Sequence, residues 1–331
     1  MKKNRTQFKL YLMYIVSFII IFEIATAYLM IKIESNALAP EKFNTLTSLK
    51  KDYNRIILGD SRSHQAIDPR ILDENSSFTT YNLAAPGMQT PFMYYAAKRF
   101  IDEKEVPEQI IVNMSFYMLG GQQWMKDIYF KHYKPTIHDT LDSYANGLNY
   151  YFVDALKWYV KTHIPSLKHE GRITKMLSDF TTIPKMYKES FKARESLLDE
   201  LYQGYMPRGY AHITDDFKLG SWNTNFHKGY SVYFRYMNRF FDLTNRYDTD
   251  IYIYEFPWPL KYKNIENHKK VHAFYTNMII KIANKYPHVH YIENKYLFLQ
   301  NKYFRDPLHL NNLGADLISR QLSDILNKEK K

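Results

Sequence analysis

The chain has 331 residues, of which 45% are hydrophobic and 17% aromatic, and this composition excludes an intrinsically disordered protein. It contains no cysteine, which excludes disulfides, thiolate metal sites and a cysteine nucleophile. The formal net charge of +11 favours an anionic partner, such as an acidic membrane face, a phosphate polymer or nucleic acid, without choosing among them.

The first predicted element is an apolar segment from Leu10 to Ile31, LYLMYIVSFIIIFEIATAYLMI, whose single charge is Glu23. About 20 apolar residues are enough to cross the hydrocarbon core of a bilayer. Several basic residues precede this segment: Lys2, Lys3, Arg5 and Lys9. The positive-inside rule therefore predicts a cytoplasmic N-terminus and an extracytoplasmic chain after Lys32.

The alternative for this segment is a cleavable signal peptide, because Ala25-Thr26-Ala27 has the small-x-small pattern of a processing site. The apolar run continues beyond that pattern, which favours an anchor. We expect a single-pass cell-membrane protein with a cytoplasmic tail at residues 1–9, a transmembrane anchor at 10–32, a polar stalk at 33–52 and an extracytoplasmic domain at 53–330.

Short β-rich runs alternate with helical patterns through that domain. One helix is expected at 93–101, one has the apolar residues Phe274, Met278 and Ile282 at helical spacing, and a last helix follows Asn311. Strands are expected at 53–58, 78–83, 109–114, 250–256 and 288–293. This alternation predicts an α/β fold with a parallel sheet and right-handed crossovers.

Residues 120–228 break the alternation and are rich in Tyr, Lys and His. We expect a mostly helical insertion that lies over the carboxyl edge of the sheet, where loops carry specificity. Lysines such as Lys126, Lys131 and Lys134 could line a path for an anionic polymer, or they could form an ordinary solvated face.

A cluster of reactive side chains follows the first strand, in the stretch IILGDSRSHQAIDP at 56–69. Ligands of open α/β folds bind at the carboxyl edge of the sheet, so Ser61 is a candidate nucleophile. The alternative is that Ser61 or Ser63 only caps a helix beginning near Ala66. Arg62 is a candidate contact for an anionic substrate, or a solvated side chain.

Near the other end of the chain, Asp306 and His309 lie three residues apart, in a loop before the last helix. A serine nucleophile needs an imidazole to take its proton, and the imidazole needs an acceptor on its other nitrogen. Both segments leave the carboxyl edge of the predicted sheet. Ser61, His309 and Asp306 are therefore the predicted catalytic triad, with Asn311 or Asn312 as the cap of the helix that follows.

At this point the chain resembles the SGNH (GDSL-like) hydrolases, particularly the membrane-anchored acyl-transfer branch that includes DltD-like and alginate-acetylation proteins. The family has short sequence motifs, called blocks. In this chain Gly59-Asp60-Ser61 resembles the first block, the seven residues YNLAAPG that end at Gly87 resemble the second, and Asp306-Pro307-Leu308-His309 resembles the last. The resemblance implies a flavodoxin-like, three-layer domain. It also implies an oxyanion hole that includes the backbone N–H groups of Ser61 and Gly87.

The third block departs from the family, which usually has Gly-x-Asn-Asp there, whereas this chain has IIVNMSFY. Asn113 is the match for the asparagine that donates to the oxyanion, and it could equally be a residue that ends a strand. The resemblance implies serine-dependent transfer of an acetyl, D-alanyl or other acyl group to a cell-envelope polysaccharide or teichoic-acid-like polymer, beside a membrane-bound O-acyltransferase-type partner.

Two alternatives stay open: an esterase or deacylase of such a polymer, and a non-catalytic protein that keeps the fold and binds polymer or acyl carrier. No cofactor, no metal and no nucleic-acid partner is expected, because the chain has no phosphate-binding loop, no dinucleotide fingerprint and no nucleic-acid module. His288 and His290 have the spacing of metal ligands, but no third ligand accompanies them. His64 is expected to be a surface residue or to lie behind the site.

Overall fold

The structure is a computed structural model. It describes residues 2–34, 52–114, 136–148, 209–214, 230–294 and 296–328, together with the single residues 160, 164, 203 and 205. The chain divides into two compact units: Met1–Pro40 with Lys134–Leu197, and Glu41–Tyr133 with Leu198–Lys331. Most of the predicted stalk and of the predicted 120–228 insertion, including Lys126, Lys131 and Lys134, lies outside the described residues.

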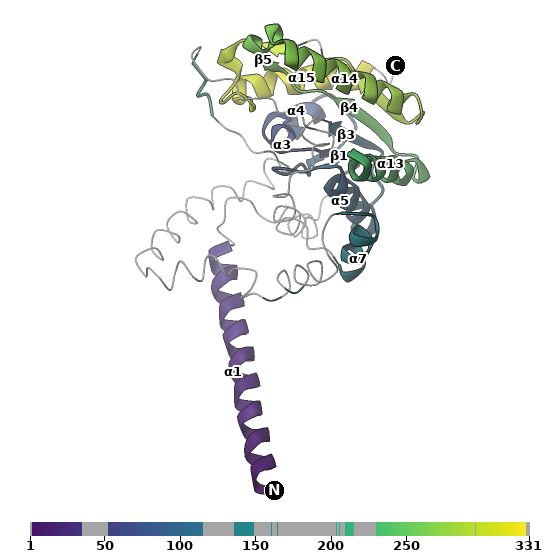
Figure 1. Ribbon diagram of the computed structural model, residues 1–331. Coiled ribbons are helices and arrows are strands. Elements are labelled where there is room, and N and C mark those ends of the chain that lie inside the picture. Colours follow the sequence, from purple (N-terminus) through teal and green to yellow (C-terminus); the bar gives the residue numbers. More distant parts are fainter. Residues whose placement is uncertain are drawn as a thin grey trace. The chain divides into compact units, whose positions relative to one another are not determined.

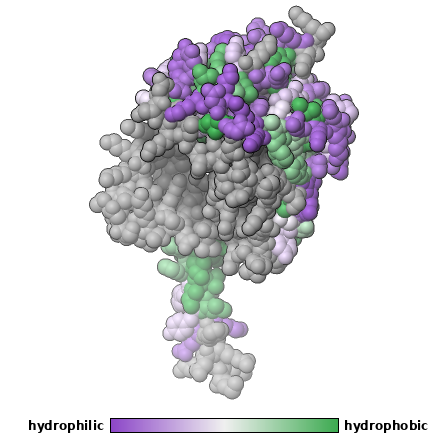
Figure 2. Space-filling view, turned by 45° about the horizontal axis from the view of Figure 1, so that its top comes forward, coloured by the Kyte–Doolittle hydropathy of each residue, from purple (hydrophilic) through white to green (hydrophobic). Residues whose placement is uncertain are grey.

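The first unit contains α1, which runs from Lys2 to Glu34. Its segment Lys9–Thr26 has a mean hydropathy of 1.8 over 18 residues and is long and apolar enough to cross a membrane. Figure 2 shows much of this helix in the hydrophobic colour. A signal sequence has the same properties, so anchoring and topology stay predictions.

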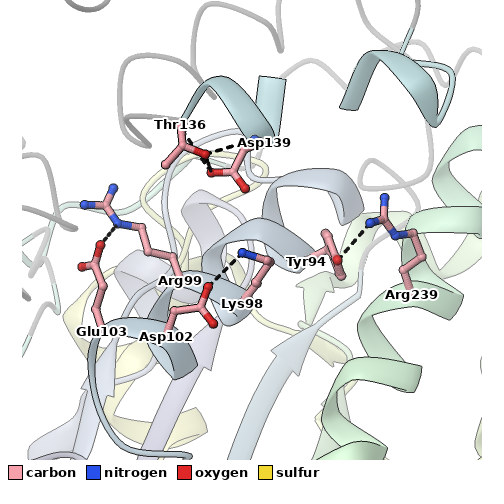
Figure 3. Close-up of polar contacts among 8 residues, drawn as sticks. All are labelled: Tyr94, Lys98, Arg99, Asp102, Glu103, Thr136, Asp139 and Arg239. Carbon is pink, nitrogen blue, oxygen red and sulfur yellow. Dashed lines mark hydrogen bonds and ion pairs between the residues drawn. The ribbon is translucent and has the colours of Figure 1, made fainter. Parts of the chain in front are cut away.

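The first unit also contains α7, Ile137–Ala145, which begins with a capping box. The Thr136 hydroxyl accepts from the backbone N–H of Asp139 at 3.1 Å, and the Asp139 carboxylate accepts from the backbone N–H of Thr136 at 3.1 Å (Figure 3). Two N–H groups that the helix itself leaves unsatisfied are thereby bonded.

The second unit is built on a five-stranded sheet with the order β2-β1-β3-β4-β6, in which every neighbouring pair is parallel (Figure 1). The strands are β1 (Arg55–Leu58), β2 (Thr80–Asn82), β3 (Gln109–Asn113), β4 (Asp250–Tyr254) and β6 (Val289–Ile292). All five predicted strands are present, each slightly shorter than expected. The prediction of a parallel α/β fold is confirmed.

Helices bury both faces of this sheet, which explains why its strands read as continuous apolar runs. The three residues Ile56–Leu58 have no exposed surface. On one face, α15 (Asn312–Lys328) packs against α3 (Ser61–Ala66) and α4 (Pro69–Asp73). One buried cluster joins the sheet residues Ile57 and Ile111 to Ile318 and Leu322 of α15.

A second helix pair packs together: α5 (Thr90–Glu103) and α13 (Tyr230–Arg246). The hydroxyls of Tyr95 and Tyr236 lie 3.0 Å apart. Figure 3 shows the bond that Arg239 donates to the hydroxyl of Tyr94, at 2.9 Å. Exposed i,i+4 ion pairs run along α5, between Lys98 and Asp102 and between Arg99 and Glu103. The sequence reading predicted α5 at 93–101 and missed α13.

The remaining elements lie between β4 and α15. Helix α14 (Glu266–Ala283) follows a short 3-10 helix, η4 (Leu260–Asn264), and a two-stranded parallel sheet pairs β5 (Trp258–Pro259) with β7 (Phe298–Leu299). A second short 3-10 helix, η5 (Asn301–Tyr303), precedes the segment that carries Asp306 and His309.

The predicted apolar side of α14 needs one correction. Phe274 is 58% exposed, whereas Ile282 is buried as predicted and Ile279 is buried as well. In α15, Leu322 and Leu326 are buried, and Leu313, in the first turn, is exposed.

Candidate active site

The turn between β1 and α3 presents Ser61 as the first residue of the helix. Asp60 is the N-cap, and its carboxylate accepts from the backbone N–H of Arg62 at 2.9 Å. The alternative interpretation, in which Ser61 or Ser63 only caps a helix beginning near Ala66, is therefore wrong, and the Ser61 hydroxyl is not required for capping. Gly59 has a φ of 145°, and a Cβ there would collide with the Ser63 hydroxyl, so the turn requires glycine.

A buried polar group lies behind this turn. The guanidinium of Arg62 pairs with the Asp60 carboxylate at 3.3 Å and lies over the ring of Trp258, 5.1 Å from its centroid. Arg62 is only 4% exposed. The structure therefore places Arg62 inside the protein, where it stabilises Asp60, and not on the surface where an anionic substrate would meet it.

Asn113 also belongs to this buried group. It ends β3, has no exposed surface, and its amide nitrogen donates to the Asp60 carboxylate at 3.2 Å. The structure gives this amide a role in holding the helix cap. One N–H of this amide is used by Asp60, and donation of the other to an oxyanion stays a prediction.

The loop after β2 is fastened to the same turn by Asn82, a residue that the sequence reading did not single out. Its amide nitrogen donates to the carbonyls of Ser63 and Ile67, both at 2.9 Å. Its amide oxygen accepts from the backbone N–H of Ala84 at 3.1 Å. Only its place at the end of a strand could have indicated this role.

Gly87 lies in that loop with a φ of 71°, a conformation that favours glycine. The loop is tied to the nucleophile turn by the N–H of Ala85, which donates to the Gly59 carbonyl at 3.1 Å. The N–H of Gly59 in turn contacts the sulfur of Met88 at 3.3 Å. The predicted oxyanion loop and the predicted nucleophile are thus parts of one connected turn, and the donation from Gly87 to an oxyanion stays a prediction.

The acid and the base lie at the tip of a small hairpin before α15. Phe304 and Leu310 form its antiparallel bridge, and both are buried. At the tip, the Asp306 carboxylate accepts from the backbone N–H groups of Leu308, at 2.9 Å, and His309, at 3.0 Å. The tip is therefore held by the side chain of its own acidic residue.

The structure brings the three predicted triad residues together. The Ser61 hydroxyl oxygen lies 2.7 Å from Nε2 of His309. Nδ1 of His309 lies 2.9 Å from each carboxylate oxygen of Asp306. A carboxylate can only accept, so Nδ1 carries a proton and Nε2 of the neutral imidazole can accept the proton of Ser61.

The Asp306 carboxylate remains ionised in this setting. Partial burial alone would raise its pKa, but the hydrogen bond from His309, the charge of that ring and the N–H groups of Leu308 and His309 together lower the pKa of Asp306 below its ordinary value. An ionised Asp306 can hold the imidazole in one orientation and stabilise its protonated form.

The other histidines take separate positions. His64 is buried, so it is not a surface residue. His288 contacts Thr244 at 3.1 Å, whereas His290 contacts Asp250 at 3.1 Å, so the two do not converge on a common point. Among the residues that the structure describes, no group of three or more histidine, aspartate or glutamate side chains could hold a metal ion.

Comparison with known proteins gives little beyond this geometry. No known family model and no curated protein matches the chain. A solved structure from Streptococcus pneumonia, described as a candidate platelet activating factor, is similar with 13% identity and a TM-score of 0.39, over 86% of this chain and 89% of that one. A similarity this low assigns neither a family nor an activity.

Proposed function

We propose that the protein is a serine-dependent enzyme of the SGNH type that cleaves an ester bond through an acyl-serine intermediate. The observation that carries this proposal is the chain of contacts from Ser61 through His309 to Asp306, at 2.7 and 2.9 Å. Hydrogen-bond distances of this kind are what nucleophile and base require before proton transfer.

In the first step, Nε2 of His309 takes the proton of Ser61 while the hydroxyl oxygen attacks the ester carbonyl. The resulting tetrahedral oxyanion needs preorganised donors, each worth about 3 kcal/mol of transition-state stabilisation. The backbone N–H groups of Ser61 and Gly87 are the proposed donors. Ser61 is the first residue of α3, where a backbone N–H has no partner within the helix.

In the second step, His309 returns the proton to the leaving alcohol, which leaves an acyl group on Ser61. A second hydroxyl compound then enters, His309 removes its proton, and its oxygen attacks the carbonyl carbon. His309 then returns this proton to the Ser61 oxygen as the acyl–serine bond breaks, which restores the free enzyme. Water at this step completes ester hydrolysis, and a sugar or polyol hydroxyl completes acyl transfer. Asp306 stabilises the imidazolium that forms transiently in both steps.

We further propose that the acceptor is a hydroxyl of a cell-envelope glycopolymer. Support for this comes from the helix α1, which could hold the enzyme at a membrane, and from the net charge of +11, which favours an anionic polymer. A membrane-embedded acyl donor protein would be the natural partner of an anchored enzyme. An esterase that removes acyl groups from such a polymer is the alternative.

The proposal is tested by labelling the purified full-length protein with a fluorophosphonate that reacts with activated serines. We expect covalent labelling of Ser61, located by mass spectrometry of the labelled peptide. Absence of labelling in a folded protein would favour the non-catalytic alternative, in which the same fold binds polymer or acyl carrier.

A second experiment separates acyl transfer from hydrolysis. It compares the release of alcohol from a chromogenic ester with and without an added polyol.

The proposed topology has its own test, which is protease digestion of intact cells or spheroplasts. We expect the domain after Lys32 to be digested and the N-terminal tail to be spared. Protection of the whole chain would show that the domain is not extracytoplasmic, without affecting the serine chemistry.

A further inference from the structure

The hairpin that carries Asp306 and His309 at its tip has an opposite end, where it joins the rest of the fold. This end is called the hairpin base, in the structural and not the chemical sense, and the triad chemistry does not explain its contacts. Its strands are closed by the Phe304–Leu310 bridge, and its tip by the N–H of Arg305, which donates to the His309 carbonyl at 2.9 Å. Each of these bonds lies inside the hairpin. They fix the shape of the hairpin but not its position relative to Ser61.

Asn311, directly after the hairpin, makes the contacts that fix its position. Its amide nitrogen donates to the carbonyl of Lys302 at 2.7 Å and to the carbonyl of Ala211 at 3.2 Å. Its amide oxygen caps α15 by accepting from the backbone N–H of Gly314 at 3.1 Å. Its own backbone N–H donates to the Tyr303 carbonyl at 3.0 Å. Asn311 has no exposed surface, so its own donor and acceptor atoms are shielded from water.

A segment distant in sequence, Gly209–Thr214, forms the outer side of this base. The N–H of Ile213 donates to the Phe304 carbonyl at 3.0 Å, and the Gly209 carbonyl accepts from the N–H of Asn312 at 2.9 Å. The contact of Asn311 with Ala211 lies between these two bonds. The segment therefore follows the hairpin base over several residues, and Asn311 provides a side-chain bond between them.

Gly314 shows how closely this base is packed. A Cβ at this position would collide with the Tyr303 carbonyl and would lie 2.9 Å from the side chain of Leu310. A contact with a backbone carbonyl cannot be relieved by rotation of a side chain. Helix α15 and the hairpin base therefore approach as closely as the absence of a side chain permits.

We propose that Asn311 is a positioning residue for His309: it holds the hairpin base against Gly209–Thr214 and α15, so that Nε2 of His309 stays within hydrogen-bond distance of Ser61. This inference rests on the proposed function and adds a residue to it. Asn311 is only two positions from His309, so movement of the hairpin base is passed to the imidazole. A displacement of about 1 Å at the reacting atoms can cost roughly 100-fold in rate.

Asn311→Asp is the sharpest test. The substitution keeps the size of the side chain and keeps a good N-cap for α15, because aspartate and asparagine cap helices about equally well. It removes both N–H donors and places carboxylate oxygens against the carbonyls of Lys302 and Ala211. We expect the rate of fluorophosphonate labelling of Ser61 to fall by about 10- to 100-fold, and kcat for a small ester to fall more than its KM rises.

Asn294→Asp is the matched control. Asn294 is also buried, its amide nitrogen donates to the Glu255 carbonyl at 2.7 Å, and its amide oxygen accepts from the N–H of Tyr296 at 2.7 Å. The chemical change is the same, but these two bonds join Asn294 to Glu255 and Tyr296 and not to the hairpin. We expect the control to label at close to the wild-type rate, even where its melting temperature falls as much as that of Asn311→Asp.

A readout that does not depend on activity separates this inference from the proposed function. The proton on Nδ1 of His309 can be followed by NMR of the full chain in micelles with 15N-labelled histidine, and it is assigned by its loss in His309→Gln. We expect this resonance to shift or broaden in Asn311→Asp and to stay in place in Asn294→Asp. If the wild type is not labelled but the resonance still responds in this way, the positioning role stands and the proposed function fails.

Wild-type labelling and an unchanged resonance in Asn311→Asp would overturn the inference while leaving the proposed function intact. Equal losses in Asn311→Asp and the control would also overturn it, because they would show general destabilisation. If Asn311→Asp does not fold, the variant Gly314→Ala tests the positioning role instead. This variant keeps Asn311 with its cap and its N–H donors and improves helix propensity, but the added methyl group pushes against the Tyr303 carbonyl. We expect slower labelling and a shifted resonance, and wild-type behaviour in both would refute the positioning role.

Discussion

Two imidazole–carboxylate pairs in this molecule have the same contact distance and different surroundings. His309 and Asp306 lie 2.9 Å apart at the tip of a hairpin, with 45% of the Asp306 side chain exposed. His272 of α14 and Glu255, which follows β4, also lie 2.9 Å apart, but only 9% of the Glu255 side chain is exposed. The distance between acid and base therefore does not distinguish a candidate catalytic pair from a structural one.

The two pairs differ in which ring nitrogen is hydrogen-bonded to the carboxylate. Asp306 is bonded to Nδ1 of His309, so Nε2 of the same ring faces the Ser61 hydroxyl. Glu255 takes Nε2 of His272, whose ring faces the ring of His268 with centroids 6.4 Å apart. The hydrogen bond that His272 donates to the Glu255 carboxylate is the main reason that the pKa of His272 is raised, with burial opposing it. One pair is arranged to move a proton and the other to hold a charge.

The largest expected effect follows from that difference. Ser61→Ala and His309→Ala should each lower acyl transfer, ester cleavage or serine labelling by at least about 10⁴-fold, because nucleophile and base act as one unit. His272→Gln should label at the wild-type rate. Circular dichroism of each variant provides the folding control. If Ser61→Ala is labelled at another residue, and at the wild-type rate, Ser61 is not the nucleophile.

A smaller loss is expected for Asp306→Asn. The amide can donate to Nδ1, which would stabilise the wrong tautomer of His309 and remove the charge that balances the imidazolium. We expect a loss of roughly 10²- to 10⁴-fold with measurable residual labelling. Glu255→Gln makes the same chemical change in the other pair and should have no comparable effect. Equal activity of Asp306→Asn and wild type would remove Asp306 from the mechanism.

The surroundings of the His272–Glu255 pair are tested through the neighbouring residue His268. Burial, together with the nearby His272, lowers the pKa of His268 to about 4. The unfolded state, with an ordinary histidine pKa of about 6.5, binds a proton first as the pH falls. The free energy of unfolding should therefore decrease by about 3 kcal/mol between pH 6.5 and 4 on account of this residue. His268→Phe should flatten that decrease in denaturant titrations. An unchanged pH dependence in the variant would contradict the burial argument.

The smallest effect is expected for His272→Gln, and it has the opposite pH dependence. A raised pKa in the folded state means that the contribution of His272 is fully present below its unfolded pKa of about 6.5 and is lost as the pH rises through the higher folded value. We expect a loss of roughly 0.5–1 kcal/mol below about pH 6, after allowance for solvent screening, and none well above the folded pKa. A loss that is the same at all pH values would mean that packing, and not charge, holds the ring.

Sequence reasoning predicted the parallel sheet because buried strands such as RIIL are short, apolar and bounded by polar residues. It predicted the three residues that meet because Ser61 and His309 both follow segments that end at one edge of the sheet. It missed helix α13, although the buried residues of this helix, Tyr233, Tyr236, Met237, Phe240 and Phe241, recur at helical spacing. It also misjudged Arg62, because a single sequence does not reveal that Asp60 and Trp258 enclose this side chain.

The positions of Asn82 and Asn311 show the other limit of sequence reasoning. Asparagine is common in turns, so its type predicts a turn or a cap and nothing more. Their importance comes from carbonyls that are distant in sequence, such as Ala211 for Asn311, 100 residues away. Bonds of this kind depend on the completed fold and leave no local pattern.

Ser61 and His309, which share a hydrogen bond, are 248 residues apart in the chain. As the protein is synthesised, the turn that carries the nucleophile is complete long before the residues that supply its base leave the ribosome. Contacts this distant are also formed late, because closing a long loop must be balanced by many interactions at once. If the proposed mechanism is correct, the growing chain carries an ordinary, unreactive serine until the hairpin with His309 has been made, and the Ser61 hydroxyl gains its base only when this hairpin and α15 dock.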